Sequence, residues 1–148
     1  MSIEPIVKTI HVKLPPERAF RLFTEKMGTW WPVETHSVSA GMGLPSAQVI
    51  FHTHVGGKIE EVAQDGSRHI WGHVTEWVPG TLVSFTWHPG KSEDRKTNVR
   101  VEFVAENGGT RVTLSHEGWE NLSDEDRATH ANYDKGWIGV LARYQAAG

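Results

Sequence analysis

Residues 97–116 read TNVRVEFVAENGGTRVTLSH, and the fold is clearest from these twenty residues. It contains two runs in which apolar and polar residues alternate. The apolar face holds Val99, Val101 and Phe103 in the first run and Val112, Leu114 and His116 in the second. Alternation of this kind indicates strands with one buried face. Asn107-Gly108-Gly109 lies between the runs and is typical of a tight turn, so the stretch predicts an antiparallel hairpin.

The same pattern extends toward the N-terminus. Five further runs predict strands at residues 6–14, 47–54, 58–63, 69–78 and 82–87. Short turn sequences such as Gly56-Gly57, Asp65-Gly66 and Pro79-Gly80 separate most of them. Successive strands joined by short turns favour an antiparallel meander.

Two short helices are expected between the first two strands. Pro15-Pro16 starts one helix over residues 17–26, since proline is tolerated in the first turn of a helix. Gly28 ends it, and residues 29–32, which include Trp30 and Trp31, predict a second short helix or turn. Residues 33–46 show no period, so they are either an entrance flap or a mobile surface loop.

The chain ends with a predicted amphipathic helix over residues 123–146. Ser123 and Asp126 fit a capping pattern at its start. One stripe of the helix carries Tyr133, Trp137, Val140, Leu141 and Tyr144. The sequence therefore predicts a single α+β domain over residues 1–148. We expect a curved seven-stranded antiparallel sheet wrapped around the long C-terminal helix, with two short helices after the first strand.

Composition excludes several classes of function. The 148 residues include no cysteine, which excludes disulfides and thiolate chemistry. The formal net charge of −3 argues against a nucleic-acid partner, because such binding needs clustered positive charge. No apolar run is long enough to span a membrane and no secretory signal is evident, so we expect a cytoplasmic protein with no membrane partner.

Seven tryptophans in one domain suggest an aromatic cavity between the sheet and the final helix. We expect a small hydrophobic or aromatic molecule to bind there. The candidate ligand-binding residues are Trp30, Trp31, Phe51, Phe85, Trp87, Val101, Phe103, Leu114, His116, Trp137 and Leu141. The alternative is that these side chains are simply a solid core, since large aromatics pack well.

His116 lies on the apolar face of its strand, where an imidazole needs a hydrogen-bond partner. Either it is a polar or acid/base group inside the cavity, or it is a core histidine paired with other groups.

No metal site or cofactor is expected. His52 and His54 share a face of one predicted strand, as do His69 and His73 if their strand is regular. We expect these four to be surface histidines. Glu60, Glu61, Glu76 and Glu102 form no paired-carboxylate pattern and are expected on solvated strand faces, so no catalytic residue is assigned.

Several segments, taken in their order along the chain, resemble the START-like superfamily. Within it they resemble the bacterial homologues of the activator of heat-shock protein ATPase. The segments are Pro15 to Phe20, Trp30-Trp31, Gly56-Gly57-Lys58, Gly72-His73-Val74, Leu82 to Trp87, Thr110 to Leu114, His116 to Trp119 and Gly136-Trp137. The resemblance covers nearly the whole chain and implies the helix-grip fold of that superfamily.

The superfamily contains ligand binders, cyclases, hydrolases and co-chaperone domains, because one fold supports several functions. Binding of a small molecule in the cavity is the leading hypothesis. A cyclase or hydrolase that uses His116 as acid/base is an alternative. A co-chaperone-like protein-interaction module is another, with a chaperone as partner, although these residues include no counterpart of the eukaryotic co-chaperones' separate N-terminal domain.

Overall fold

The computed structural model describes residues 4–43 and 47–148. Its centre is one antiparallel sheet of seven strands in the order β1-β7-β6-β5-β4-β3-β2. The strands are β1 (Ile6–Val12), β2 (Ala47–Phe51), β3 (Lys58–Ala63), β4 (Arg68–Val78), β5 (Leu82–Trp87), β6 (Thr97–Glu106) and β7 (Gly109–Glu117). The hairpin predicted from residues 97–116 is the β6–β7 pair, in which Val101 lies opposite Leu114.

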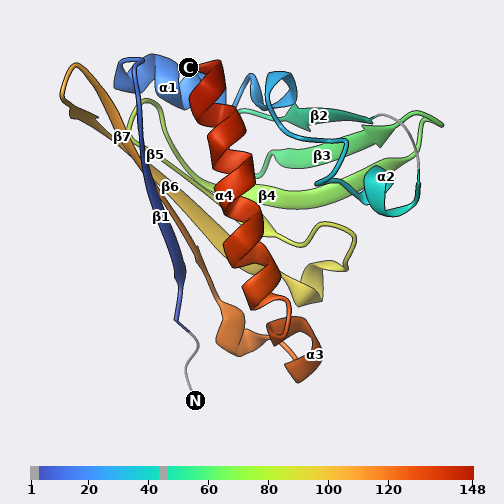
Figure 1. Cartoon of the computed structure of the whole chain (residues 1–148). Coiled ribbons are helices and arrows are strands. Elements are labelled where there is room, and N and C mark those ends of the chain that lie inside the picture. The colour runs from blue at the N-terminus through green and yellow to red at the C-terminus, as the bar shows by residue number, and fades with distance from the viewer. Residues whose placement is uncertain (1–3, 44–46) are drawn as a thin grey trace.

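The sheet curls around the last helix, which crosses its concave side (Figure 1). The helices are α1 (Pro16–Phe23), α2 (Val38–Gly41), α3 (Asp124–Arg127) and α4 (His130–Ala147), with short 3₁₀ turns η1 (Met27–Thr29), η2 (Glu93–Arg95) and η3 (Trp119–Asn121). The predicted fold class, a helix-grip fold with two short helices after the first strand, is confirmed. None of the described helices has the length and apolarity needed to cross a bilayer.

The predicted C-terminal helix is interrupted. Ser123 caps α3 as expected, with its hydroxyl accepting from the Asp126 N–H at 3.3 Å. The chain then turns at Ala128 and Thr129, and the Thr129 hydroxyl donates to the Asp126 carbonyl at 2.6 Å. That side-chain bond satisfies a carbonyl at the end of α3 and competes with a continuous helix. The amphipathic stripe therefore belongs to α4 alone, and Trp137, Val140, Leu141 and Tyr144 are its buried residues.

Two irregularities bend β4. Its register against β3 shifts between Ile70 and Gly72, and its register against β5 shifts between Val74 and Glu76. One extra residue in a strand increases the local bend and twist. Gly72 is required at the first irregularity, because a Cβ there would lie 1.7 Å from the Thr86 carbonyl oxygen of β5. The close approach of β4 to β5 contributes to the curl of the sheet.

Helix α1 fills one half of the space between the sheet and α4. The ring of Phe20 packs against Phe103 with centroids 5.2 Å apart, and Phe23 packs against Tyr144 at the same separation. The Tyr144 hydroxyl donates to the Ala19 carbonyl at 2.7 Å. Side chains of α1 therefore fill this half of the space between the sheet and α4.

Candidate functional site

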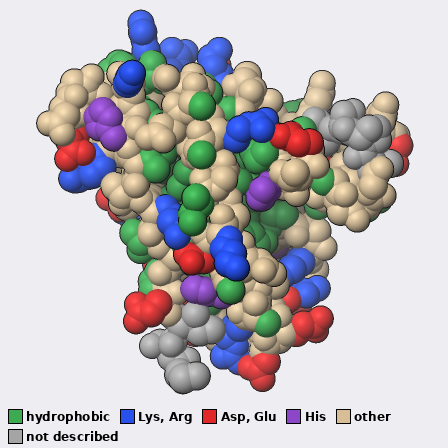
Figure 2. Space-filling view, in the orientation of Figure 1, with side chains coloured by type: hydrophobic (Ala, Val, Ile, Leu, Met, Phe, Trp, Pro, Cys, Tyr) green, Lys and Arg blue, Asp and Glu red, His purple; other side chains and the backbone are tan. Residues whose placement is uncertain are grey.

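A cavity of about 520 Å³ lies beside the first half of α4. In the orientation of Figure 2, the surface is hollowed between α4 and α2, with hydrophobic side chains in the recess. The segment after η1 supplies Trp31, Thr35, His36, Ser37, Val38, Gly41 and Met42; the sheet and the loop after β5 supply Trp71, Trp87, Pro89 and Gly90; and α4 supplies Asn132, Tyr133, Gly136, Trp137 and Val140.

Four indole rings form the inner wall, and we call the space that they line the indole cavity. Trp31 is central, with ring centroids 5.1 Å from Trp71, 5.7 Å from Trp87 and 6.0 Å from Trp137. Trp87 also packs against Trp71 and Trp137, at 5.6 Å each. Tilted and edge-on contacts at these distances are favourable aromatic geometries. The wall therefore brings together side chains from three separate parts of the chain.

Helix α2 lies over the cavity and is held there by a buried carboxylate. Glu61 Oε1 accepts from the Val38 N–H at 2.8 Å and from the Trp71 indole N–H at 3.0 Å, and Oε2 accepts from the Ser39 N–H at 2.7 Å. Burial alone would raise the pKa of Glu61, but the donors from Ser39, Val38 and Trp71 outweigh it and lower the pKa below its ordinary value. Glu61 thus connects α2 to β3 and to the cavity wall.

The expectation that Glu60 and Glu61 lie on solvated strand faces is wrong. Glu61 is fully buried, and Glu60 is 5% exposed; the Glu60 carboxylate pairs with Arg68 and lies 3.4 Å from the His52 imidazole. Buried carboxylates need such partners. Glu76 and Glu102 are exposed, as expected.

The expected entrance flap, residues 33–46, is described as far as residue 43. Within it, Val38–Gly41 forms α2, and the Ser37 hydroxyl caps this helix by accepting from the Ala40 N–H at 3.0 Å. Residues 35–38, 41 and 42 line the cavity. Residues 44–46 lie outside the described residues.

His116 belongs to the core. The Trp137 indole N–H donates to His116 Nδ1 at 3.0 Å, so Nε2 carries the hydrogen and donates to Thr97 Oγ1 at 2.6 Å. The Thr97 hydroxyl then donates to the Trp87 carbonyl at 3.2 Å. Burial, with a smaller effect of the charge on His130, lowers the pKa of His116 to about 3. Both ring nitrogens are occupied, and His116 is not among the residues that line the cavity.

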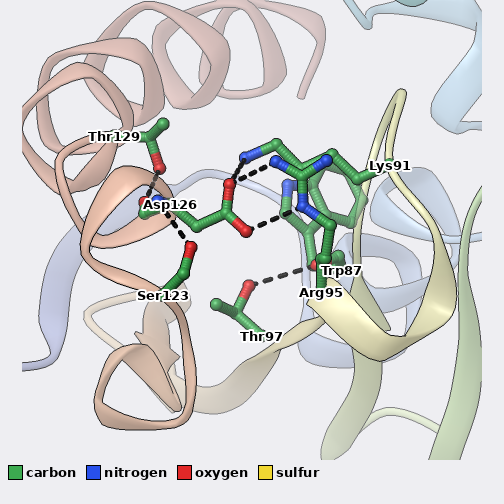
Figure 3. A network of polar contacts seen from close by, with 7 residues as sticks. All are labelled: Trp87, Lys91, Arg95, Thr97, Ser123, Asp126 and Thr129. Atoms are coloured by element: carbon green, nitrogen blue, oxygen red, sulfur yellow. Dashed lines mark hydrogen bonds and ion pairs between the residues drawn. The ribbon is translucent and has the colours of Figure 1, made fainter.

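The loop after β5 is anchored by an ion-pair network (Figure 3). The Arg95 guanidinium contacts both carboxylate oxygens of Asp126, with Nε 2.8 Å from Oδ2, and Lys91 Nζ lies 3.4 Å from Oδ1. Hydrogen bonding from Arg95, helped by Lys91, holds the pKa of Asp126 well below its usual range despite burial. Since Pro89 and Gly90 belong to this loop, the network fixes one rim of the cavity to α3.

Three of the eleven sequence-predicted ligand residues line the cavity: Trp31, Trp87 and Trp137. The others are buried outside its lining, and they are Trp30, Phe51, Phe85, Val101, Phe103, Leu114, His116 and Leu141. Sequence reasoning placed Tyr133 on the inward stripe of the helix but not in the site, and it did not include Trp71, Val38 or His36.

The histidine arrangement differs from the strand-based expectation. Strand β2 ends at Phe51, so alternation does not govern His52 and His54. His69 and His73 do not keep a common face, because an extra residue of β4 lies between them. Among residues 4–43 and 47–148, no group of three or more histidines and carboxylates could hold a metal ion.

Solved structures of similar fold cover nearly the whole length of the chain. An anthrahydroquino-γ-pyrone synthase is 28% identical, with a TM-score of 0.66 over 98% of this chain and 97% of that one. The Aha1 dimer from Colwellia psychrerythraea is 19% identical, with a TM-score of 0.69 over 98% and 96%. A protein from Chromobacterium violaceum is 23% identical, with a TM-score of 0.65 over 96% of each chain. At these lower identities the last two likenesses establish the fold alone.

No functionally curated protein matches the chain. Residues 13–145 match the sequence profile described as Activator of Hsp90 ATPase homolog 1-like protein, and because this match covers most of the chain, the chain belongs to that family.

Proposed function

We propose that the chain binds a small aromatic molecule non-covalently in the indole cavity. The observation that carries the proposal is the wall of four indole rings around a space of about 520 Å³. Ligand pockets commonly enclose roughly 300–1,000 Å³ and combine apolar aromatic walls with a few polar groups. Here Thr35, His36 and Asn132 supply polar groups among the lining residues.

The likeness to the synthase supports an aromatic ligand. That protein shares 28% of its residues with this chain over nearly the full length of both, and its name describes a fused aromatic ring product. A flat ring system also matches the chemistry of an indole wall, since aromatic rings attract one another through stacked and edge-on contacts.

Two glycines of α4 offer a matched test. A Cβ at Gly136 would lie 3.6 Å from His36 Nε2, so a leucine side chain there would project into the lined space. A Cβ at Gly139 would meet no atom within 4 Å, and Gly139 is not among the lining residues. Both substitutions replace a helical glycine and raise helix propensity by a similar amount.

We expect N-phenylnaphthylamine to bind the unmodified protein, with a rise in probe emission and quenching of tryptophan emission. Gly136→Leu should weaken this binding at least tenfold, while Gly139→Leu should leave it unchanged. Equal binding by both variants would place the probe elsewhere. No binding to the unmodified protein would instead favour the protein-interaction alternative, in which the cavity has no ligand.

A cyclase-type enzyme acting on such a molecule is the second candidate, and the likeness to the synthase favours it. His116 does not suit the acid/base role, because it lies outside the lining and its pKa of about 3 keeps it neutral. His36 lines the cavity, with Nδ1 hydrogen-bonded to the Thr35 hydroxyl at 2.7 Å and Nε2 toward Gly136. Its imidazole is therefore the better candidate for proton transfer.

The enzyme hypothesis predicts a difference between binding and turnover. His36→Gln should retain affinity for a molecule that co-purifies with the protein and slow its conversion by ~10²-fold or more, the usual contribution of a general acid or base. Equal conversion rates for the variant and the unmodified protein would remove His36 from any mechanism.

A further inference from the structure

One residue that lines the indole cavity carries a buried hydrogen-bond donor with no partner among the described residues. Trp87 is 3% exposed, and its Nε1–H has no hydrogen-bond acceptor among the described residues. Buried polar groups in folded proteins are nearly always paired, so an unpaired donor requires an explanation. In this case the donor belongs to a residue that lines the cavity.

The other buried indoles show that Trp87 is the exception. Their N–H groups all have acceptors: Trp30 donates to the Leu22 carbonyl, Trp31 to the His36 carbonyl, Trp71 to Glu61, Trp119 to the His116 carbonyl and Trp137 to His116 Nδ1. Within residues 4–43 and 47–148, five buried indole donors thus have acceptors, and the donor of Trp87, a cavity-lining residue, has none.

A second donor lies close to the first. Tyr133 also lines the cavity, and burial raises the pKa of its phenol, although the nearby Trp87 N–H opposes that rise. The phenol therefore keeps its proton near neutral pH. The Trp87 N–H and the Tyr133 hydroxyl lie near one another without a hydrogen bond of accepted geometry between them. An oxygen atom with two lone pairs could accept from both.

The charge of the lining selects a neutral acceptor. The described lining residues include no Lys, Arg, Asp or Glu. Lys91 and Arg95, in the loop that follows Gly90, are both paired with Asp126. A carboxylate or phosphate would lose its hydration in this cavity with no Lys or Arg among the described lining residues to pair with, which is unfavourable. A carbonyl oxygen accepts hydrogen bonds and carries no net charge.

We propose, on the basis of the function proposed above, that the ligand is a planar aromatic carbonyl compound whose oxygen accepts from Trp87 Nε1–H. The indole wall binds the ring system, and the Tyr133 hydroxyl provides a second donor to the same oxygen. Trp87 is then the residue that distinguishes an aromatic ketone from an aromatic hydrocarbon of the same shape.

Fluorenone and fluorene test this distinction, because they share one flat tricyclic skeleton and differ only in a carbonyl in place of a methylene group. Fluorene is the more apolar of the two, so burial alone favours fluorene. The proposal predicts the opposite order, with fluorenone binding roughly tenfold more tightly in titrations of tryptophan fluorescence, the effect of one satisfied buried donor. Trp87→Phe should abolish this preference.

An NMR measurement on the unmodified protein keeps the test independent of the folding of Trp87→Phe. With ¹⁵N-labelled tryptophan, fluorenone should move the Trp87 indole N–H resonance downfield, whereas fluorene should not. The indole resonances of Trp30 and Trp119, which have protein acceptors outside the cavity, serve as internal controls.

Equal affinities, or tighter binding of fluorene, would overturn the assignment of a carbonyl ligand and leave the proposed binding function intact. If N-phenylnaphthylamine and both tricyclic compounds fail to bind, the proposed function fails and this inference fails with it. Tighter binding of fluorenone that persists in a folded Trp87→Phe would show that another group binds the carbonyl and would contradict the role of Trp87.

Discussion

His116 couples three elements through its two ring nitrogens, and its neutral form is required for that arrangement. A proton on Nδ1 would displace the hydrogen bond from Trp137, which is 3.0 Å away. Sequence analysis placed His116 correctly on the buried face of β7. It could not choose between a core and a catalytic role, because the partners Thr97 and Trp137 come from β6 and α4 and are set by tertiary packing.

The buried imidazole predicts a specific pH dependence of stability. The folded pKa of about 3 lies below the ordinary value of 6.5, so the unfolded chain binds a proton first as the pH falls. The contribution of His116 is fully present above pH 6.5 and is lost as the pH falls toward 3, by roughly 2–3 kcal/mol at pH 4.5. Urea denaturation at pH 7 and pH 4.5 should show a smaller change for His116→Gln than for the unmodified protein. An identical change would contradict this account.

Glu61 accepts hydrogen bonds from three donors, two of them backbone amides of α2. Glu61→Ala would leave the Trp71 indole N–H buried without an acceptor, and we expect a stability loss of about 2–4 kcal/mol. Amide hydrogen exchange at Val38 and Ser39 should accelerate as well, since both lose their acceptor. The control is Glu102→Ala on the exposed face of β6, which should change neither quantity by a measurable amount. Unchanged exchange at Val38 and Ser39 would disprove the connection.

At the scale of elements, alternation along the sequence predicts the strands well and predicts side-chain direction only where a strand is regular. All seven strands begin and end within three residues of their predicted positions. Each irregularity in β4 changes the side that the following residues face. The first one lies between His69 and His73, so an even spacing does not put these two side chains on one face. Trp71, beside the first irregularity, was missed as a cavity residue for the same reason: nothing in the local sequence marks the irregularity except Gly72.

Gly72 provides a test of the β4 geometry. Gly72→Ala would place a methyl group 1.7 Å from the Thr86 carbonyl oxygen, so the strands must separate. We expect the variant to lose at least about 3 kcal/mol of stability or to fail to fold, as judged by circular dichroism and urea denaturation. Gly139→Ala, where a Cβ meets nothing within 4 Å, should instead gain up to ~1 kcal/mol from helix propensity. If Gly72→Ala instead folds with unchanged stability, the close approach of β4 to β5 at Gly72 would be contradicted.

At the scale of the molecule, the interior has a solid half and a hollow half. The sequence predicts that α4 faces the concave sheet, but it does not show how far α1 fills the space between them. Phe20 and Phe23 occupy that space beside Phe103, which explains why the predicted cavity residues on the central strands are core instead. The cavity lies where no α1 side chain reaches, and its walls come from segments distant in sequence.

This division predicts that two equally buried side chains, when replaced by alanine, lose different amounts of unfolding free energy. Phe103→Ala, in the solid half, should cost about 3–5 kcal/mol through lost packing and a new void. Trp137→Ala should lose less packing, about 2–3 kcal/mol, although its side chain is larger, because one side of its ring already faces the cavity, and the lost hydrogen bond to His116 should add about 1 kcal/mol. Urea denaturation measures both. A larger cost for Trp137→Ala than for Phe103→Ala would indicate that no cavity exists beside Trp137.

Native mass spectrometry of the protein purified from its own host would detect a small aromatic molecule held in the indole cavity. We predict a stoichiometric adduct of drug-sized mass that is present in the unmodified protein and in Gly139→Leu and is absent from Gly136→Leu. A bare protein mass in all three samples, or an adduct that is unaffected by Gly136→Leu, would contradict the account.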